Sequence, residues 1–362
     1  MIKIGIVGTG GMAHYHATTL QNIQNTSIIA ACDVDVNRLN KFADNYNIKE
    51  RYTSIDELLE KSGVDAIANV TPDKFHKTIA LKCFKNNKHI FSEKPLAENY
   101  PDAKEMYEVA KKTNLINMVN FSYRNSSGLQ NIANLVQSGE LGNVRHVEAS
   151  YYQSWLTAKY WGDYREEDRL LWRLSSKHGS KGTLGDIGVH IFDFVTFPVG
   201  SIKKLNTKLK TFEDKGHKIG QYKLDANDSF VTMLEFENGA LGTVASTRFA
   251  TGEINKLNLK IYCEKGAVRI AFDDPIKEGN YYEVTTDTET VFSDEDKKLN
   301  KKLKWEKVVT RPTPNNIERF IESINSGIND QPDFERGAKI QKILDSCFES
   351  SEKESWIYLN RI

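Results

Sequence analysis

Cysteine is scarce in this sequence, and the few cysteines that it has lie far apart. No two of them form a C-x-x-C pair. Metal sites and disulfide frameworks need cysteines at close, regular spacing, so the sequence predicts reduced, mostly buried thiols in a reducing compartment and no metal site. The four cysteines are Cys32, Cys83, Cys263 and Cys347.

An excess of charge of either sign is also absent. The 49 basic and 49 acidic residues cancel to a formal net charge of zero. Nothing in this balance favours a nucleic acid, an anionic membrane surface or another strongly charged partner. No apolar run approaches the length of a membrane span, and the first residues, "MIKIGIVGTG", enter a strand without an apolar signal region. We therefore expect a cytoplasmic protein with no membrane partner.

The chain of 362 residues is long enough for two domains. Its first 124 residues alternate between short apolar runs and helical patterns, which is typical of βαβ units in a doubly wound parallel sheet. Such a sheet binds ligands beyond the carboxyl ends of its strands. The expected strands are Ile2–Val7, Ile28–Cys32, Asp65–Val70, His89–Ser92 and Leu115–Val119, and the expected helices are Asn37–Tyr46, Ile55–Lys61, Lys74–Asn86 and Asp102–Thr113.

Residues 125–362 follow a different pattern, which predicts an α+β domain with a large open, mostly antiparallel sheet. Alternation is clearest in "KLNLKIYCE", and "DSFVTMLEFENGALGTVAS" reads as two strands joined at Asn238-Gly239. Residues 287–304 resemble a solvated insertion, and helices are expected at Ser127–Ser138, Asn315–Ser326 and Phe334–Ser350. Helices on one side leave the other face of the sheet to be covered, so we expect substrate binding and oligomerisation here, as a homodimer or homotetramer.

The first strand leads directly into Gly8-x-Gly10-x-x-Ala13, a spacing used for dinucleotides. Gly8 permits a tight turn, Gly10 lets a pyrophosphate approach the backbone, and Ala13 allows close packing of the next helix. Asp33, 20 residues beyond Ala13, is suited to the ribose 2′-hydroxyl. We expect Arg38 to lie in the turn into the next helix and to provide no phosphate clamp, so NAD is favoured over NADP. The alternative is an ordinary tight β–α turn.

Two further strand ends carry candidate residues. Thr71 and Pro72 should lie over the cofactor, or form a turn before a helix, and His76 in the first turn of that helix either faces the nicotinamide or packs. Glu93-Lys94-Pro95 follows another strand. This pair is either a weak surface ion pair or places Lys94 in the ligand crevice, where the Lys-Pro bond could be cis.

The stretch "KGTLGDIGVHIFDF" places Asp186 and His190 four residues apart, on one face of a helix. Asp186 after glycine is typical of an N-cap, and a lone histidine is often structural; a proton-handling pair is the alternative. Arg173 could bind a hydroxyl, a phosphate or a carboxylate, or pair with nearby acids. Several aromatic residues precede this helix, and we expect one or two of them to touch a sugar while the rest pack: Tyr151, Tyr152, Trp155, Tyr160, Trp161, Tyr164 and Trp172.

Taken in order, these motifs resemble the Gfo/Idh/MocA family of nicotinamide-dependent oxidoreductases. The matching features are Gly8-Thr9-Gly10-Gly11-Met12-Ala13, Asp33, Thr71-Pro72, Glu93-Lys94-Pro95, Tyr123-Arg124, Trp172-Arg173 and Gly185-Asp186-x-x-x-His190-x-x-Asp193. The segment "SSKHGSKGTLGD" departs from the purer glycine run of relatives, which puts the conformation of the substrate loop in doubt.

The resemblance implies a role for each matching residue. Lys94, Asp186 and His190 would be catalytic: His190 the base, Lys94 the stabiliser of charge on the reacting oxygen, and Asp186 the group that grips a neighbouring hydroxyl. Asp193 would orient the helix or the imidazole, or be structural. Cofactor contacts would come from Gly8, Thr9, Gly10, Gly11, Met12, Asp33, Thr71, Pro72, His76, Glu93, Lys94 and Arg124, and substrate contacts from Lys94, Tyr123, Trp172, Arg173, Asp186 and His190.

The resemblance therefore implies hydride transfer between NAD(H) and a secondary hydroxyl or ketone of a sugar, inositol or related polyol. We also consider two alternative functions. One is an NAD-dependent glycosidase, which would oxidise its substrate transiently and release a sugar. The other is a non-catalytic, nucleotide-bound sugar sensor built on the same fold.

Overall fold

The computed structural model describes residues 1–212, 217–273 and 279–359 and divides into two compact units. Unit 1 comprises Met1–Ser122 and Pro314–Lys342, and unit 2 comprises Tyr123–Thr313 and Ile343–Ile362. Compared with the expected 1–124 and 125–362, the first boundary lies two residues earlier, and residues 314–342 return to unit 1. Within the described ranges, no helix is long and apolar enough to cross a membrane.

Unit 1 is a six-stranded sheet in the order β3-β2-β1-β4-β5-β6, with every neighbouring pair parallel. The chain starts in the middle and reverses direction between β1 and β4, so the carboxyl ends of these two strands mark the point where doubly wound sheets bind ligands. The strands are β1 (Ile2–Val7), β2 (Thr26–Cys32), β3 (Glu50–Tyr52), β4 (Ala66–Asn69), β5 (His89–Ser92) and β6 (Asn117–Val119).

The predicted helices of unit 1 are present to within a few residues. They are α1 (Gly11–Gln21), α2 (Val36–Asn45), α3 (Ile55–Lys61), α4 (His76–Lys85) and α5 (Tyr100–Ala110). The short strand β3 was not predicted, because three residues with a charged pair at their start give no alternating pattern.

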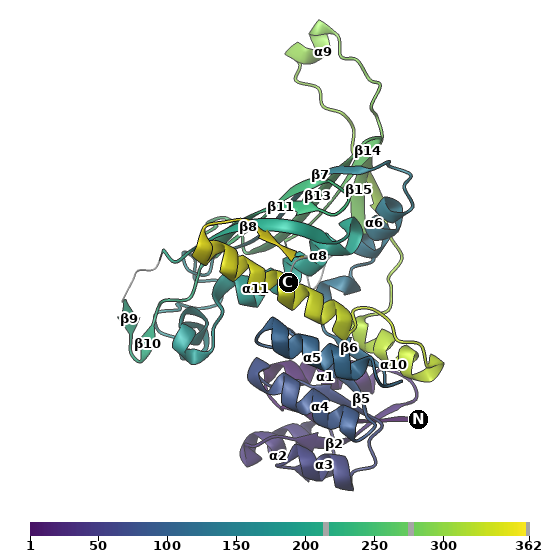
Figure 1. The fold of residues 1–362 in the computed structure, drawn as a ribbon, viewed down its shortest axis with the longest axis vertical. Helices are drawn as coiled ribbons and strands as arrows, with labels where there is room; N and C mark the ends of the chain where they lie inside the picture. The colour runs from purple at the N-terminus through teal and green to yellow at the C-terminus, as the bar shows by residue number, and fades with distance from the viewer. Residues whose placement is uncertain (213–216, 274–278, 360–362) are drawn as a thin grey trace. The chain divides into compact units, whose positions relative to one another are not determined.

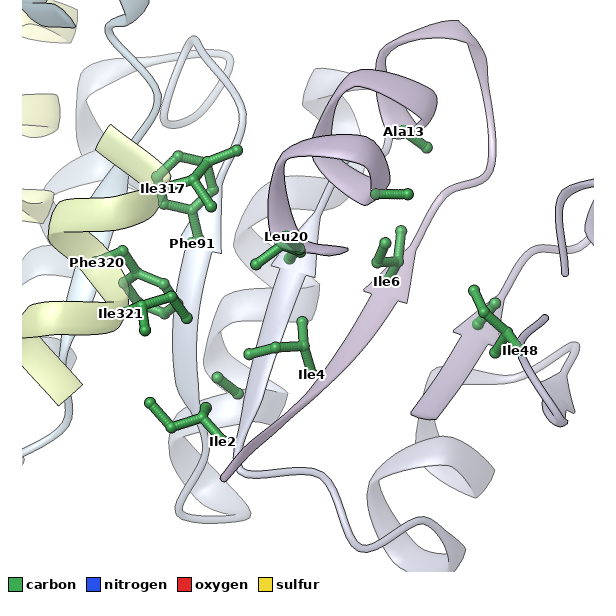
Figure 2. Close-up of a cluster of buried hydrophobic side chains, with 14 of the residues drawn as sticks. Ile2, Ile4, Ile6, Ala13, Leu20, Ile48, Phe91, Ile317, Phe320 and Ile321 are labelled. Atoms are coloured by element: carbon green, nitrogen blue, oxygen red, sulfur yellow. The ribbon is translucent and has the colours of Figure 1, made fainter. Parts of the chain in front are cut away.

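The core of unit 1 shows why the late helix α10 (Asn316–Ser326) belongs to it. Ile2, Ile4 and Ile6 alternate along β1 and point to one face of the sheet, where α1 covers them. Figure 2 shows Phe320 and Ile321 of α10 beside the same sheet, near Phe91 of β5, and the Phe91 and Phe320 ring centroids lie 5.5 Å apart. The other boundary of the returning segment falls inside α11 (Phe334–Lys353).

Unit 2 contains the expected open sheet, with nine strands in the order β16-β15-β14-β13-β7-β12-β11-β8-β17. All neighbouring pairs are antiparallel except β12 and β7. The strands are β7 (Val144–Gln153), β8 (Ile202–Lys210), β11 (Ser229–Phe236), β12 (Leu241–Thr247), β13 (Asn255–Cys263), β14 (Gly266–Phe272), β15 (Tyr281–Thr285), β16 (Glu306–Val309) and β17 (Ile357–Tyr358), with β9 (Lys218–Ile219) and β10 (Tyr222–Lys223) forming a separate pair.

The predicted hairpin is confirmed: β11 and β12 pair in antiparallel register, and Gly239 in their connection has φ +85°. Helices α6 (Ser127–Gln137) and α8 (Val189–Val199) pack on each other and on strands of this sheet (Figure 1). On the opposite face, Val231 and Met233 of β11 and Leu241 of β12 are about half exposed. The predicted solvated insertion is an arm between β15 and β16 that carries the short helix α9 (Asp294–Lys298) and extends beyond the sheet (Figure 1).

Candidate active site

The turn after β1 has the geometry that a dinucleotide needs. Gly8 has φ +86°, and a Cβ at this position would lie 2.6 Å from the carbonyl oxygen of Val70, so only glycine fits. Gly10 has φ −74°, and a Cβ there would meet no heavy atom within 4 Å. Gly10 is the N-cap of α1, so the open space lies at a helix N-terminus that attracts phosphate. The turn therefore fits the pyrophosphate of NAD.

Asp33 lies at the end of β2 and anchors the same turn. Its Oδ2 accepts hydrogen bonds from the backbone N of Thr9 at 2.8 Å and from Thr9 Oγ1 at 2.9 Å. Burial alone raises the pKa of Asp33, but the hydrogen bonds from Arg38, from the Asp35 backbone and from Thr9 together hold it well below its ordinary value. Asp33 is thus a fixed carboxylate beside the cofactor turn.

Arg38 departs from the prediction. It lies inside α2 rather than in a turn before it, and its side chain returns to Asp33, with Nε 3.0 Å from Oδ2 and Nη2 2.6 Å from Oδ1. The cause is the N-cap at Asp35, three residues before Arg38, which starts the helix at Val36 and brings Arg38 back to the strand end. A cation therefore does lie beside the expected ribose acid. Of the other residues matched to this turn, Gly11 opens α1 and Met12 is about half exposed.

The loop after β4 is held by His76. Thr71 Oγ1 donates to Asn69 Oδ1 at 2.7 Å, and Pro72 precedes a short 3₁₀ turn, η1 (Asp73–Phe75). The His76 ring is fully buried, with Nε2 2.8 Å from the carbonyl oxygen of Thr71 and Nδ1 2.7 Å from that of Pro95. Of the two predicted alternatives for His76, the packing one matches this geometry, because both ring nitrogens face backbone carbonyls.

Lys94 follows β5 at the sheet edge where β1 and β4 also end. It is partly exposed, and the Lys94-Pro95 peptide bond is cis. Glu93 before it is buried: Asn120 Nδ2 donates to its Oε1 at 2.8 Å, and the backbone N of Lys94 donates to its Oε2 at 3.2 Å. Glu93 therefore fixes the backbone at Lys94 and does not itself lie exposed at the carboxyl edge of the sheet.

His16 was missed by the sequence reasoning. It lies on the buried face of α1, three residues after Ala13, and its Nε2 lies 2.7 Å from Glu93 Oε1. Burial raises the pKa of Glu93, but the hydrogen bond and charge of His16, with Asn120 and Lys94, lower it overall to about 2. The signal available in the sequence was a polar residue at i+3 in an otherwise apolar stripe of Ala13, Ala17 and Leu20.

In unit 2, Asp186 and His190 lie on one continuous helical segment, but Asp186 is not an N-cap. It lies inside a π-helical turn, η5 (Leu184–Gly188), which leads into α8, and His190 lies in the first turn of α8. The N-cap of η5 is Thr183. Instead of capping, Asp186 Oδ2 accepts a hydrogen bond from Arg248 Nη2 at 2.9 Å. π-helical turns are frequent at functional sites.

His190 is nearly buried, and its ring lies against Tyr123, with ring centroids 4.6 Å apart. The Tyr123 hydroxyl in turn is hydrogen-bonded to that of Tyr151. The two neighbouring charged residues form a buried, two-pronged ion pair, in which Arg124 Nε lies 2.7 Å from Asp193 Oδ2 and Nη2 lies 2.9 Å from Oδ1. Of the roles considered for Asp193, this pair supports the one that orients α8.

Trp172 and Arg173, two of the predicted substrate contacts, are partly exposed. The Arg173 guanidinium lies 4.6 Å from the Trp172 ring, and its Nε lies 3.9 Å from Asp186 Oδ2. Most of the other aromatic residues pack instead: Trp155 and Tyr164 belong to a buried cluster that Trp161 borders. Arg248, which binds Asp186 and is fully buried, was not predicted.

Comparison with known proteins gives the family. Residues 2–121 match the Gfo/Idh/MocA profile described as "Oxidoreductase family, NAD-binding Rossmann fold", and residues 133–359 match its "C-terminal alpha/beta domain". The chain belongs to the Gfo/Idh/MocA family. It is an NAD-dependent oxidoreductase, as the resemblance implied.

Named relatives in this family include sugar and inositol dehydrogenases. The levoglucosan dehydrogenase of Pseudarthrobacter phenanthrenivorans is 25% identical over 341 residues, which covers 84% of this chain and 82% of that protein. The myo-inositol 2-dehydrogenase of Thermotoga maritima is 25% identical over 278 residues, 76% of each chain. A structure of levoglucosan dehydrogenase with NADH and levoglucosan matches the fold with a TM-score of 0.84 at 22% identity, covering 99% of both chains.

Proposed function

We propose that this chain oxidises a secondary hydroxyl of a sugar, inositol or related polyol to a ketone, or catalyses the reverse reduction. The observation that carries the proposal is the position of Lys94 at the carboxyl end of β5, on the sheet whose β1 ends in the cofactor turn. The substrates named for two family members, levoglucosan and myo-inositol, are of this class.

Gly8, Gly10 and Asp33 would hold the NAD, which supplies the hydride acceptor or donor when bound. The chain supplies the rest of the chemistry. His190 takes the proton from the hydroxyl, because imidazole exchanges protons near neutral pH. Lys94 donates a hydrogen bond to the reacting oxygen and stabilises its developing negative charge. Asp186, with a side chain that is 34% exposed, accepts a hydrogen bond from a neighbouring hydroxyl.

NADH formation across a panel of sugars, anhydrosugars and inositols tests this proposal. Lys94→Ala and His190→Ala should each lower kcat by about 100-fold or more, because each removes a group that acts on the moving proton or the charge it leaves. Lys61→Ala is the matched control, since its side chain is exposed and lies outside the candidate site. Full turnover in both site variants would overturn the assigned roles.

Two other outcomes would replace the proposal. Release of a sugar from a glycoside with no net NADH would indicate a transiently oxidising glycosidase. Stabilisation by NADH and sugar without turnover of any substrate would indicate a sensor.

We also propose a cytoplasmic homodimer or homotetramer that buries the half-exposed sheet face of Val231, Met233 and Leu241. Light scattering should give a mass of two or four chains, and Met233→Glu should reduce it.

A further inference from the structure

Arg248 follows strand β12 and is one of the largest fully buried side chains in the described part of the chain. Its Nη2 donates to Asp186 Oδ2 at 2.9 Å, and its Nη1 donates to the carbonyl oxygen of Arg173 at 3.2 Å. Its guanidinium lies 4.8 Å from the Trp155 ring, and its Nε is buried without a hydrogen-bond partner. Burying a cation costs desolvation free energy, so a buried arginine calls for a structural or functional explanation.

The exposed fractions of the Arg248 and Asp186 side chains indicate why Arg248 is buried there. The Arg248 side chain is 0% exposed, whereas that of Asp186 is 34% exposed. Arg248 therefore lies behind Asp186, out of reach of any ligand, while the carboxylate can still be approached from solvent. Any effect of Arg248 on a bound molecule must pass through the groups that it holds, the Asp186 carboxylate and the Arg173 backbone.

We propose that Arg248 is a positioning residue that holds the Asp186 carboxylate in the orientation that accepts the hydrogen bond of a substrate hydroxyl. This inference rests on the proposed function. A carboxylate that accepts a hydrogen bond from a guanidinium is placed as an acceptor, so Arg248 suits Asp186 to gripping a hydroxyl, and proton transfer is left to His190.

The geometry explains why this position carries arginine rather than lysine. One guanidinium nitrogen binds Asp186 and another binds the backbone of Arg173, so a single planar group sets the position of two predicted substrate residues. Arg173 Nε also approaches Asp186 Oδ2, at 3.9 Å, so two cations face one carboxylate oxygen. Asp228, which is also buried, is a further acid whose charge acts on Arg248. Lysine carries its three donors on a single nitrogen and cannot offer two separate nitrogens in one plane to these partners.

A double-mutant cycle between Arg248→Lys and Asp186→Asn tests the inference. On the sugar that the wild type oxidises best, Arg248→Lys should lower kcat/KM by about 10- to 100-fold, as expected for a lost hydrogen bond to a charged group. In the Asp186→Asn background, the same change should have little further effect. Arg269→Lys is the matched control, because Arg269 also pairs with a carboxylate, Glu283, and stacks on a tryptophan, Trp305, away from Asp186. Losses that multiply in the double variant would overturn the inference.

The same four proteins also give a measurement that needs no activity. In urea unfolding, the shifts of the midpoint caused by Arg248→Lys and Asp186→Asn should not add if the two residues interact. If the wild type oxidises no polyol but this coupling is present, the proposed function fails and the fixing of Asp186 by Arg248 stands. If the shifts add, the inference fails whatever the enzyme oxidises. Should Arg248→Lys not fold, Arg248→Gln takes its place in the same cycle.

Discussion

Arg38 and Asp33 form a two-pronged ion pair beside the cofactor turn, with Arg38 Nη2 2.6 Å from Asp33 Oδ1 and Nε 3.0 Å from Oδ2. The carboxylate also accepts hydrogen bonds from the Thr9 backbone and hydroxyl and from the Asp35 backbone. Its acceptor sites are therefore fully used, and a ribose hydroxyl must replace one donor. Arg38, with a side chain that is 48% exposed, is the donor most easily displaced.

This pair predicts how the preference for NAD over NADP can be changed. Asp33→Ser removes the acid that repels a 2′-phosphate and releases Arg38 to bind it, so the ratio of kcat/KM for NADP to that for NAD should rise at least about 10-fold. Asp33→Ser combined with Arg38→Met should lose this gain, since no cation then remains from the pair. Initial rates with both cofactors measure the ratio. An equal gain in the double variant would show that Arg38 plays no part.

The two glycines of the turn should respond differently to the same substitution. Gly8→Ala combines a positive φ with a Cβ only 2.6 Å from a carbonyl oxygen, so it should lower the melting temperature by several degrees and weaken NADH binding. Gly10→Ala meets no protein atom within 4 Å and should leave the melting temperature unchanged. It should still weaken NADH binding about 10-fold or more, because its methyl group occupies the pyrophosphate space.

Fluorescence titration with NADH and thermal unfolding of both variants check this contrast. Unchanged NADH affinity in Gly10→Ala would place the pyrophosphate elsewhere. A Gly8→Ala variant as stable as the wild type would show that the turn can relax around the new methyl group.

The strands and helices of unit 1 could be predicted because their patterns are local. The isoleucines of β1 alternate, and Ser54 begins α3 where the helix Ile55–Lys61 was expected. The return of α10 to unit 1 could not be predicted in this way, because its apolar face shows that it packs but not on what. The partner of Ile317, Phe320 and Ile321 lies more than 200 residues earlier in the chain.

The residues of the candidate site also fall into two groups, those that a local motif reveals and those that it does not. Gly8, Gly10, Asp33 and Lys94 were found because they follow strands at fixed offsets. His16, Arg38 and Arg248 were missed or misjudged because each acts on a residue found by motif. His16 lies 77 residues from Glu93 in the sequence, and Arg248 lies 62 residues from Asp186, so no motif of fixed spacing links either pair. The π-helical turn at Asp186 was missed because the residues themselves read as an ordinary helix start.

His16 and Glu93 predict an acid-dependent loss of stability. The ordinary pKa of glutamate is 4.5, and Glu93 has a pKa of about 2 in the folded chain. Between these values the unfolded state binds more protons than the folded state, so the free energy of unfolding should fall as the pH drops from about 5 towards 2. Above pH 5 this contribution is fully present.

Glu93→Gln should flatten that part of the pH profile, because it removes the titrating carboxylate while keeping the shape. Urea unfolding at several pH values between 2 and 7 measures the slope. Glu108→Gln provides a control, since it also replaces a glutamate of unit 1 by its amide and no ion pair of Glu108 is described. Equal slopes in the wild type and Glu93→Gln would show that Glu93 is not held ionised by His16 and Asn120.

The last prediction concerns Arg124 and Asp193. Both are buried, at 2% exposure each, and their two hydrogen bonds hold the start of unit 2 against α8. His190, which contacts Tyr123, lies on the same helix, three residues before Asp193. Arg124→Met removes the cation that pairs with the buried Asp193 carboxylate, so the free energy of unfolding should fall by about 3–5 kcal/mol. Replacing both residues by apolar ones, Arg124→Met with Asp193→Leu, should recover most of that loss, because no buried charge then remains. Urea unfolding of the single and double variants measures the difference. A double variant less stable than the single one would show that the hydrogen bonds themselves, rather than the buried charge, stabilise this part of unit 2.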